Sequence, residues 1–172
     1  MILSNSAYER TDVTEGLPGI PMSLKFKLVD NDGSCASFPY ASVYIWHVDK
    51  EGIYSGYNNG GTDARGKTFF RGFTAVDERG EVTFKTIFPG KYGNLATHIH
   101  YQVFLYNDTS DMAHLTSQFT LPASEVRKVQ ATNMYPGANA GSNNSQRQIT
   151  ELKGNVTDGY EAFQLVSMRV PS

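Results

Sequence analysis

The chain has 172 residues, of which 40% are hydrophobic and 12% aromatic, and its formal net charge at pH 7 is -2. This length suits one domain better than two, and it is enough to bury a core without disulfide or metal support. No basic segment dominates, so we expect neither nucleic acid nor a membrane as a partner. Cys35 is the only cysteine, which excludes an intramolecular disulfide. The first ten residues do not resemble a signal peptide, and the sequence leaves open whether the protein is secreted or cytoplasmic.

Segments typical of strands follow one another along the chain. Residues 1–21 are polar and rich in glycine and proline, and we expect them to form an N-terminal arm. Leu24, Phe26 and Leu28 then alternate with polar residues, which indicates a strand with one buried face. Further strands are expected at residues 42–48, 68–74, 82–88, 97–106, 116–121 and 162–170, and a helix at residues 123–134.

Seven or more short strands separated by turn residues favour an antiparallel sandwich or barrel. The lack of a regular helix–strand alternation argues against a doubly wound fold. We therefore expect residues 1–172 to form one all-β domain of about seven to nine strands, with at most one short helix. Residues 52–66 contain five glycines and form a long loop, and long ordered loops are often functional.

The sharpest chemical feature is His98-Ile99-His100 within one expected strand. Residues i and i+2 of a strand point to the same face, so both imidazoles project together and Ile99 points into the opposite layer. Two neutral imidazoles side by side form half of a site for a transition metal. The alternative is a pair of ordinary surface histidines.

Two tyrosines stand in the turns around this strand. Tyr92 precedes the histidines by six residues, and Tyr54 lies in the long loop. A tyrosine in a turn usually packs with its hydroxyl in water. Its pKa is near 10, so it ionises at neutral pH only beside a strong positive charge. A trivalent ion would supply that charge, and two phenolates would offset most of it in a buried pocket.

Five sequence motifs, taken together in their order along the chain, point to one protein family. They are the run from Ala41 to Gly56 with Tyr54 at its end, Phe70-Arg71-Gly72, the turn Asp77-Glu78-Arg79-Gly80, the run from Phe84 to Tyr92, and Thr97-His98-Ile99-His100. In this order they resemble the intradiol ring-cleavage dioxygenases, the family of catechol and protocatechuate 3,4-dioxygenases. The likeness extends from about residue 12 to about residue 145, and it is closest to the small single-chain branch of that family.

The resemblance implies an antiparallel β-sandwich with one non-haem Fe(III) per chain. By this match Tyr54, Tyr92, His98 and His100 are the four protein ligands, and a hydroxide takes the fifth position. The implied reaction opens a small catechol-type substrate with both atoms of O2 and gives a cis,cis-muconate-type product. Tyr92 matches the tyrosine that leaves the metal and takes a substrate proton, and Tyr54 matches the one that stays bound. A homo-oligomer is possible.

Two further residues match family positions near the substrate. They are Gln118, in Thr116-Ser117-Gln118-Phe119, and Arg71. The family usually carries an arginine three residues before the first ligand histidine, and Leu95 stands there in this chain. A leucine cannot stabilise developing negative charge. Arg71, Lys91 or Arg65 would have to supply it from a loop, and residues 56–65 could shape the substrate mouth.

Three readings follow from these residues. The first is an active Fe(III) intradiol dioxygenase. The second is an iron- or ligand-binding protein of the same fold whose turnover is impaired by Leu95. The third is a β-sandwich recognition module with structural tyrosines and no iron. We expect His47 to form hydrogen bonds within the fold and His114 to lie in a polar loop, and neither to bind metal.

Overall fold

The computed structural model describes residues 6–32, 34–59, 61–105, 112–136 and 149–169. Within these residues the chain forms eight strands, one α-helix and one turn of 3-10 helix. They are η1 (Ser6–Tyr8), β1 (Pro21–Asp30), β2 (Ala41–Trp46), β3 (Arg71–Ala75), β4 (Glu81–Ile87), β5 (His98–Leu105), β6 (Leu115–Thr120), α1 (Ala123–Gln130), β7 (Glu151–Asn155) and β8 (Gly159–Met168). No described helix has the length and apolar character needed to cross a bilayer.

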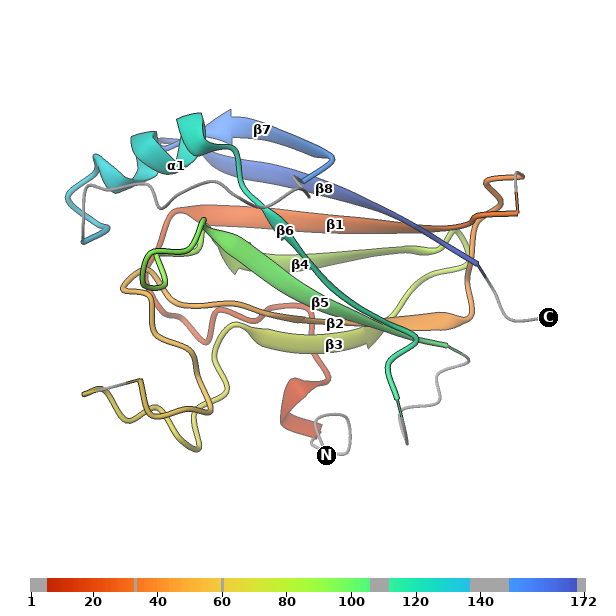
Figure 1. The fold of residues 1–172 in the computed structure, drawn as a ribbon, viewed down its shortest axis with the longest axis horizontal. Helices are drawn as coiled ribbons and strands as arrows, with labels where there is room; N and C mark the ends of the chain where they lie inside the picture. Colours follow the sequence, from red (N-terminus) through yellow and green to blue (C-terminus); the bar gives the residue numbers. More distant parts are fainter. Residues whose placement is uncertain (1–5, 33, 60, 106–111, 137–148, 170–172) are drawn as a thin grey trace.

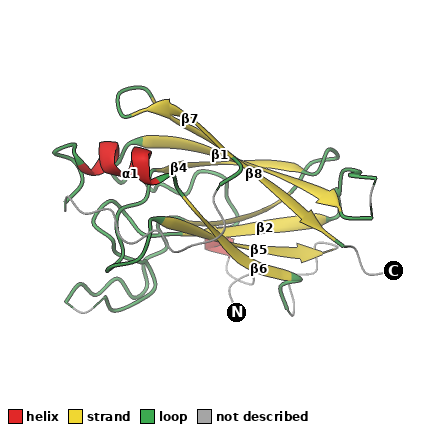
Figure 2. Cartoon of the chain, turned by 45° about the horizontal axis from the view of Figure 1, so that its top comes forward, coloured by secondary structure: helices red, strands yellow, loops and turns green. Residues whose placement is uncertain are grey.

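The strands form two four-stranded sheets that face each other (Figures 1 and 2). One sheet has the order β4-β1-β8-β7 and the other the order β3-β2-β5-β6. The expected all-β sandwich is therefore confirmed. Helix α1 lies at one end of the sandwich, at the same end as the loops that follow β2 and β4 (Figure 1).

The core fills the space between the sheets with the side chains that the alternating pattern predicts. Leu24 and Phe26 of β1 are fully buried, and they face Ile45 of β2 and Ile99 of β5, which are fully buried as well. The Phe26 ring lies 5.4 Å from the ring of Tyr101, centroid to centroid. Burial of this apolar surface is the main stabilising contribution to the fold.

One strand pair departs from a purely antiparallel arrangement. Strands β1 and β8 run parallel, with Met22 opposite Tyr160 and Asp30 opposite Met168, while the other pairs are antiparallel. Strand β7 was not among the expected strands. It forms the edge of its sheet and is largely exposed, so it lacks the apolar alternation that marks a buried strand.

Several element boundaries also differ from expectation by one to four residues, and two of these differences have a clear local cause. Strand β3 begins at Arg71 and not at residue 68, because Phe70 adopts φ +54°, which interrupts extended backbone. Helix α1 ends at Gln130 and not at residue 134. There the amide and hydroxyl of Thr132 both donate to the Val129 carbonyl and turn the chain away.

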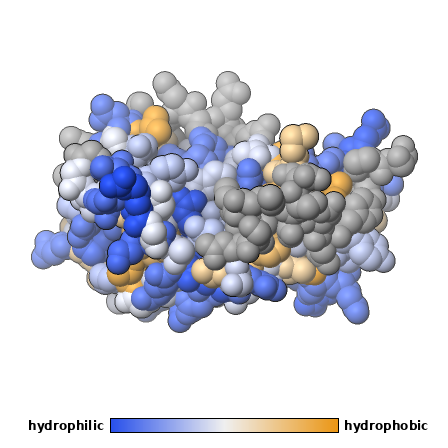
Figure 3. Space-filling view, turned by 90° about the horizontal axis from the view of Figure 1, so that it is seen from below, coloured by the Kyte–Doolittle hydropathy of each residue, from blue (hydrophilic) through white to orange (hydrophobic). Residues whose placement is uncertain are grey.

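The segment before β1 runs along one edge of the sandwich, where it pairs with β3 at Glu9 and with β4 at Asp12. Arg10 fastens it, because Nε donates to the Arg71 carbonyl (3.0 Å) and Nη2 to the Thr68 carbonyl (2.7 Å). Val13 is fully buried against Gly72, where a Cβ would collide with it. In the view of Figure 3 the surface of the described residues is mainly hydrophilic, with small scattered hydrophobic patches.

His47 links the two sheets, and this gives the stability of the fold a predicted pH dependence. Its ring is fully buried; Nδ1 donates to the Val48 carbonyl (2.7 Å), and Nε2 therefore accepts the hydroxyl of Thr86 on β4 (2.6 Å). Burial lowers its pKa from 6.5 to about 4. Between pH 6.5 and pH 4 this histidine is protonated in the unfolded chain but stays neutral in the folded one. The free energy of unfolding should therefore fall as the pH drops from 6.5 towards 4, by up to about 1.4 kcal/mol per unit from this residue.

Denaturant unfolding from about pH 8, above this window, down to about pH 4.5, within it, measures the effect. His47→Gln should be less stable at pH 8 and show a shallower dependence on pH. His114→Gln, at an exposed position, is the matched control and should keep the wild-type slope. An unchanged slope in His47→Gln would contradict the assignment.

Candidate metal centre

The two histidines of β5 project from the outer face of their sheet. His98 is buried and His100 half-buried, whereas Ile99 between them points into the core, as the alternation predicts. The register of the sheet places Trp46 of β2 opposite His100, with Gln118 of β6 on the other side. The rings of Trp46 and His100 stack at 4.7 Å with an angle of 7°. This stacking contact restricts the orientation of the His100 imidazole.

The loop between β2 and β3 carries Tyr54 to these histidines. Asp49 starts the turn, because its Oδ1 accepts the amides of Glu51 (2.9 Å) and Ile53 (2.8 Å). Asn59 closes it: its Oδ1 accepts the Tyr54 amide (3.1 Å), and its Nδ2 donates to the Tyr54 carbonyl (2.9 Å). The backbone of Tyr54 is thereby held on both sides.

The loop that carries Tyr92 touches the first loop through backbone atoms. The Asp49 carbonyl accepts the amides of both Gly52 (3.2 Å) and Gly90 (2.9 Å). A Cβ at Gly90 would collide with the carbonyl oxygens of Asp49 and Lys50, and a Cβ at Gly52 would collide with that of Lys91. Gly52 also has φ +86°, which favours glycine. Glycine at both positions is thus what lets the two loops meet.

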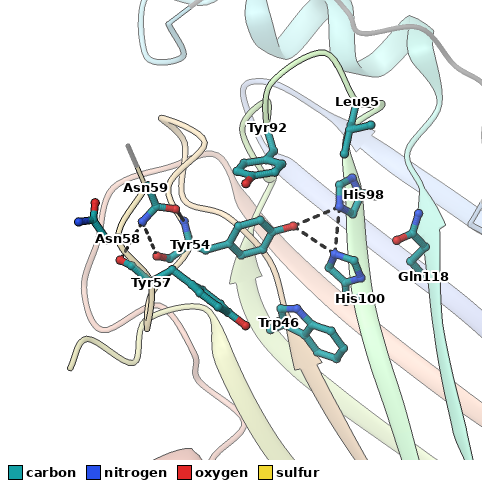
Figure 4. A pocket seen from close by; sticks show the side chains of 10 residues that line it. All are labelled: Trp46, Tyr54, Tyr57, Asn58, Asn59, Tyr92, Leu95, His98, His100 and Gln118. Carbon is teal, nitrogen blue, oxygen red and sulfur yellow. Dashed lines mark hydrogen bonds between the residues drawn. The ribbon is translucent and has the colours of Figure 1, made fainter. Parts of the chain in front are cut away.

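Three polar atoms converge at the centre of the site (Figure 4). The Tyr54 hydroxyl lies 3.1 Å from Nε2 of His98 and 3.1 Å from Nε2 of His100, and the two nitrogens are 3.1 Å apart. His98 Nδ1 donates to the Ala96 carbonyl (2.7 Å), so in the neutral ring Nε2 keeps its lone pair. We call these three residues the Tyr54–His98–His100 triangle.

Burial shifts the pKa of two members of this triangle, His100 and Tyr54. It lowers the pKa of His100 to about 4, with His98 contributing in the same direction, so the His100 imidazole is neutral at pH 7. It raises the pKa of Tyr54 to about 12, whereas the positive charge of Arg71 acts in the opposite direction. The phenol therefore stays protonated unless a strong positive charge is placed beside it.

The triangle fits a metal ion. Nitrogen and oxygen donors that bind one transition-metal ion at right angles, each about 2 Å away, lie about 3 Å from one another. No group of three or more His, Cys, Asp and Glu side chains suited to a metal occurs among the residues that the structure describes. A metal at this place would thus need phenol oxygen as well as imidazole nitrogen.

Tyr92 lies beside the triangle but not in it. Its ring is 5.0 Å from the ring of Tyr54, centroid to centroid, and 43% of the residue is exposed. In Figure 4 its hydroxyl is directed away from the two histidines. The structure thus brings together three of the four predicted ligands and places the fourth next to them.

The same row of the sheet also contains the two other predicted residues. Arg71 lies opposite Trp46, so Arg71, Trp46, His100 and Gln118 follow one another across β3, β2, β5 and β6. Gln118 lines the pocket beside His100. Arg71 does not: its buried guanidinium donates to the Ser55 carbonyl (2.7 Å) and the Tyr44 hydroxyl (2.9 Å).

The pocket around these residues has a volume of about 360 Å³. Four lining residues were not predicted as site residues: Trp46, Tyr57, Asn58 and Asn59. Three of them lie in the 56–65 loop, which was expected to shape the substrate mouth. The composition of that loop could therefore have pointed to these three residues. Trp46 reaches the site through strand pairing, for which the sequence offered no signal. Leu95 lines the pocket and is 55% exposed.

Comparisons with known proteins identify the family to which the fold belongs. A family model described as dioxygenase matches residues 4–140. The structure of an intradiol ring-cleavage dioxygenase from Tetranychus urticae aligns with a TM-score of 0.74 at 26% identity, over 94% of this chain and 86% of that one. No curated protein sequence matches the chain.

Two more distant structures share the fold. The dioxygenase domain of a dioxygenase carbohydrate-binding protein fusion from Streptomyces sp. SirexAA-E aligns with a TM-score of 0.65 at 21% identity, over 95% of this chain and 89% of that one. Catechol 1,2-dioxygenase from Pseudomonas arvilla C-1 aligns with a TM-score of 0.58 at 17% identity, over 92% of this chain and 55% of that one.

The meeting of the two loops can be tested by adding one methyl group. Gly90→Ala should cost about 1–3 kcal/mol of stability, because backbone oxygens must move, and it should weaken Fe(III) binding severalfold. Gly66→Ala is the control: Gly66 has φ +78° but no atom within 4 Å of an added Cβ, so strain occurs without collision. Chemical denaturation and ferric ion titration provide the two measurements. Wild-type Fe(III) affinity in Gly90→Ala would refute the proposed dependence on loop contact.

Proposed function

Since the chain belongs to the family of intradiol ring-cleavage dioxygenases, we propose that it is a non-haem Fe(III) enzyme that cleaves catechol-type diols with O2 to cis,cis-muconate-type products. The observation that carries this proposal is the Tyr54–His98–His100 triangle, with its three donor atoms 3.1 Å apart at the wall of a pocket. Both atoms of O2 enter the product, so the reaction needs no external reductant.

Four side chains are proposed to hold the ion: Tyr54, Tyr92, His98 and His100. When bound, ferric iron supplies Lewis-acid and template chemistry that activates a chelated catechol towards O2. The neutral imidazoles offer their Nε2 lone pairs, and two phenolates balance much of the 3+ charge. Tyr54 is held at its backbone by Asn59 and is suited to remain in place.

Tyr92 is proposed to act as the base. It is more exposed than Tyr54 and lines the same pocket, so an incoming catechol can reach its hydroxyl. As a phenolate, Tyr92 Oη would accept one proton from the substrate. The ring contact with Tyr54 keeps this oxygen next to the pocket after the transfer.

Gln118 and Arg71 take different parts in the proposal. The Gln118 amide stands next to His100 in the pocket wall, from which it can form a hydrogen bond with the substrate. Arg71 is a positioning residue, because its guanidinium ties down the Ser55 carbonyl one residue after Tyr54. Its positive charge also favours the ionised form of Tyr54.

Leu95 favours a second candidate function. It lines the pocket where the family usually has an arginine, and no lysine or arginine is among the described lining residues. A chain of this kind would bind iron and catechols but turn them over poorly, because no cation stabilises negative charge developing on the substrate.

Removal of one phenol tests the ligand assignment. Tyr54→Phe should lose most of the bound Fe(III) and the broad visible band from phenolate-to-iron charge transfer. Tyr57→Phe changes the same kind of residue in the same pocket but outside the triangle, so it should keep both. Iron analysis and visible spectra of the reconstituted proteins are the measurements. Full iron content and colour in Tyr54→Phe would exclude this residue as a ligand.

Oxygen uptake separates the two candidate functions. The iron-loaded protein with excess catechol should consume one O2 per muconate formed and release no hydrogen peroxide. A protein that keeps the visible band, and shifts it when catechol is added without O2, but shows no uptake in air would fit the binding function instead. Free Fe(III) at the same concentration is the control.

A further inference from the structure

The pocket beside the triangle offers uncharged groups to its occupant. Among the described residues its wall consists of aromatic rings, two histidines, one leucine and three side-chain amides, without aspartate, glutamate, lysine or arginine. Asn59 uses its amide to bind the backbone of Tyr54 and Tyr57. The amides of Asn58 and Gln118, in contrast, can bind hydroxyl or carbonyl groups of a ligand. They cannot neutralise a charge. An ionised substituent on the substrate would therefore lose water without gaining an ionic partner.

The arginines near the pocket are engaged elsewhere. Arg71 donates from Nε to the Ser55 hydroxyl (2.9 Å), from Nη1 to the Tyr44 hydroxyl (2.9 Å) and from Nη2 to the Ser55 carbonyl (2.7 Å). Arg65 is paired with Asp63, with 2.7 Å between Nη2 and Oδ2. Neither arginine lines the pocket, and Lys91 does not line it either. A carboxylate on the catechol ring would thus find no ready cation at this wall.

The rim of the pocket presents apolar surface. Tyr57 is 57% exposed and Leu95 is 55% exposed. The Tyr57 ring is held in place, because the Arg71 guanidinium lies 5.5 Å from its centroid and Asn59 donates to its carbonyl (3.1 Å). A volume of about 360 Å³ lies within the range of pockets that take ligands larger than a single ring. A substituent on the catechol can therefore pack against the rim.

We propose, on the basis of the function above, that this pocket selects uncharged catechols with an apolar or aromatic ring substituent and rejects carboxylated ones. Leu95 and Tyr57 are the residues that determine this selectivity. Leu95 has no positive charge to pair with an anionic substituent, and Tyr57 provides a fixed surface on which an uncharged substituent packs. The substrate class thus follows from the rim, whereas the ring-opening chemistry belongs to the triangle.

Binding can be measured without turnover, because Trp46 is the only tryptophan of the chain and stacks on His100. Fluorescence quenching of the iron-free protein should follow occupancy of the pocket, with free tryptophan as the control for light absorption by the ligand. The probes are 3,4-dihydroxybenzoate and its methyl ester, which have nearly the same shape but differ in charge. We expect the ester to bind at least about tenfold more tightly. Equal affinities, or quenching by neither probe, would overturn the proposal.

Variants at the rim test the two residues separately. Leu95→Lys supplies the missing cation and should improve binding of 3,4-dihydroxybenzoate about tenfold relative to the ester, whereas Leu95→Met should leave the ratio unchanged. Tyr57→Ala should abolish the preference for 4-phenylcatechol over catechol, and Tyr57→Phe should keep it. A Leu95→Lys protein that still discriminates against the carboxylate as wild type does would exclude Leu95 as the determinant.

The same probes separate this inference from the proposed enzyme. If the iron-loaded protein consumes O2 with the acid and the ester at equal kcat/KM, the selectivity is wrong and the dioxygenase function stands. If no catechol supports O2 uptake but the fluorescence ranking holds, the dioxygenase function is wrong and the selectivity of the pocket stands.

Discussion

The contact of two loops at the carbonyl of Asp49 is the constraint on which the candidate site depends. This oxygen accepts the amides of Gly52 and Gly90, and neither position has room for a side chain. The contact places the loop after β2 next to the loop after β4, so the rings of Tyr54 and Tyr92 lie 5.0 Å apart beside β5. The strands alone would hold the histidines, but only the joined loops bring phenol oxygen to them.

The positive charge nearest this site is the guanidinium of Arg71, which has no carboxylate partner among the described residues. Arg71 is buried in β3 and is satisfied by a carbonyl and two hydroxyl oxygens, so its positive charge is not cancelled locally. It opposes the effect of burial on the Tyr54 phenol, while burial itself keeps His100 neutral. In the proposed function, the neutral His100 imidazole is free to bind a metal, and the Tyr54 phenol ionises only beside the charge of that metal. The Arg71 guanidinium lies behind the Tyr57 ring and does not line the pocket, so a substrate cannot pair with its charge.

Much of the fold was predictable because buried faces leave a pattern in the sequence. The alternation around Phe26, and the position of Ile99 between two histidines, gave the strands and their inward faces correctly. Strand β7 was missed, since an exposed edge strand such as Glu151–Asn155 is held by backbone hydrogen bonds and needs no apolar pattern. The parallel pairing of β1 and β8 was missed for a similar reason: side-chain alternation is the same in either direction.

The sequence by itself determined the sandwich class, the shared face of His98 and His100, and the family to which the chain belongs. These depend on local period and on ordered motifs, which are properties of neighbouring residues. Tertiary structure decided the rest. Strand register places Trp46 and Gln118 on either side of His100. Arg71 lies outside the pocket wall, and Tyr92 lies beside the triangle without joining it. Such contacts join residues far apart in the chain, and their geometry is fixed by pairing and packing that no local pattern records.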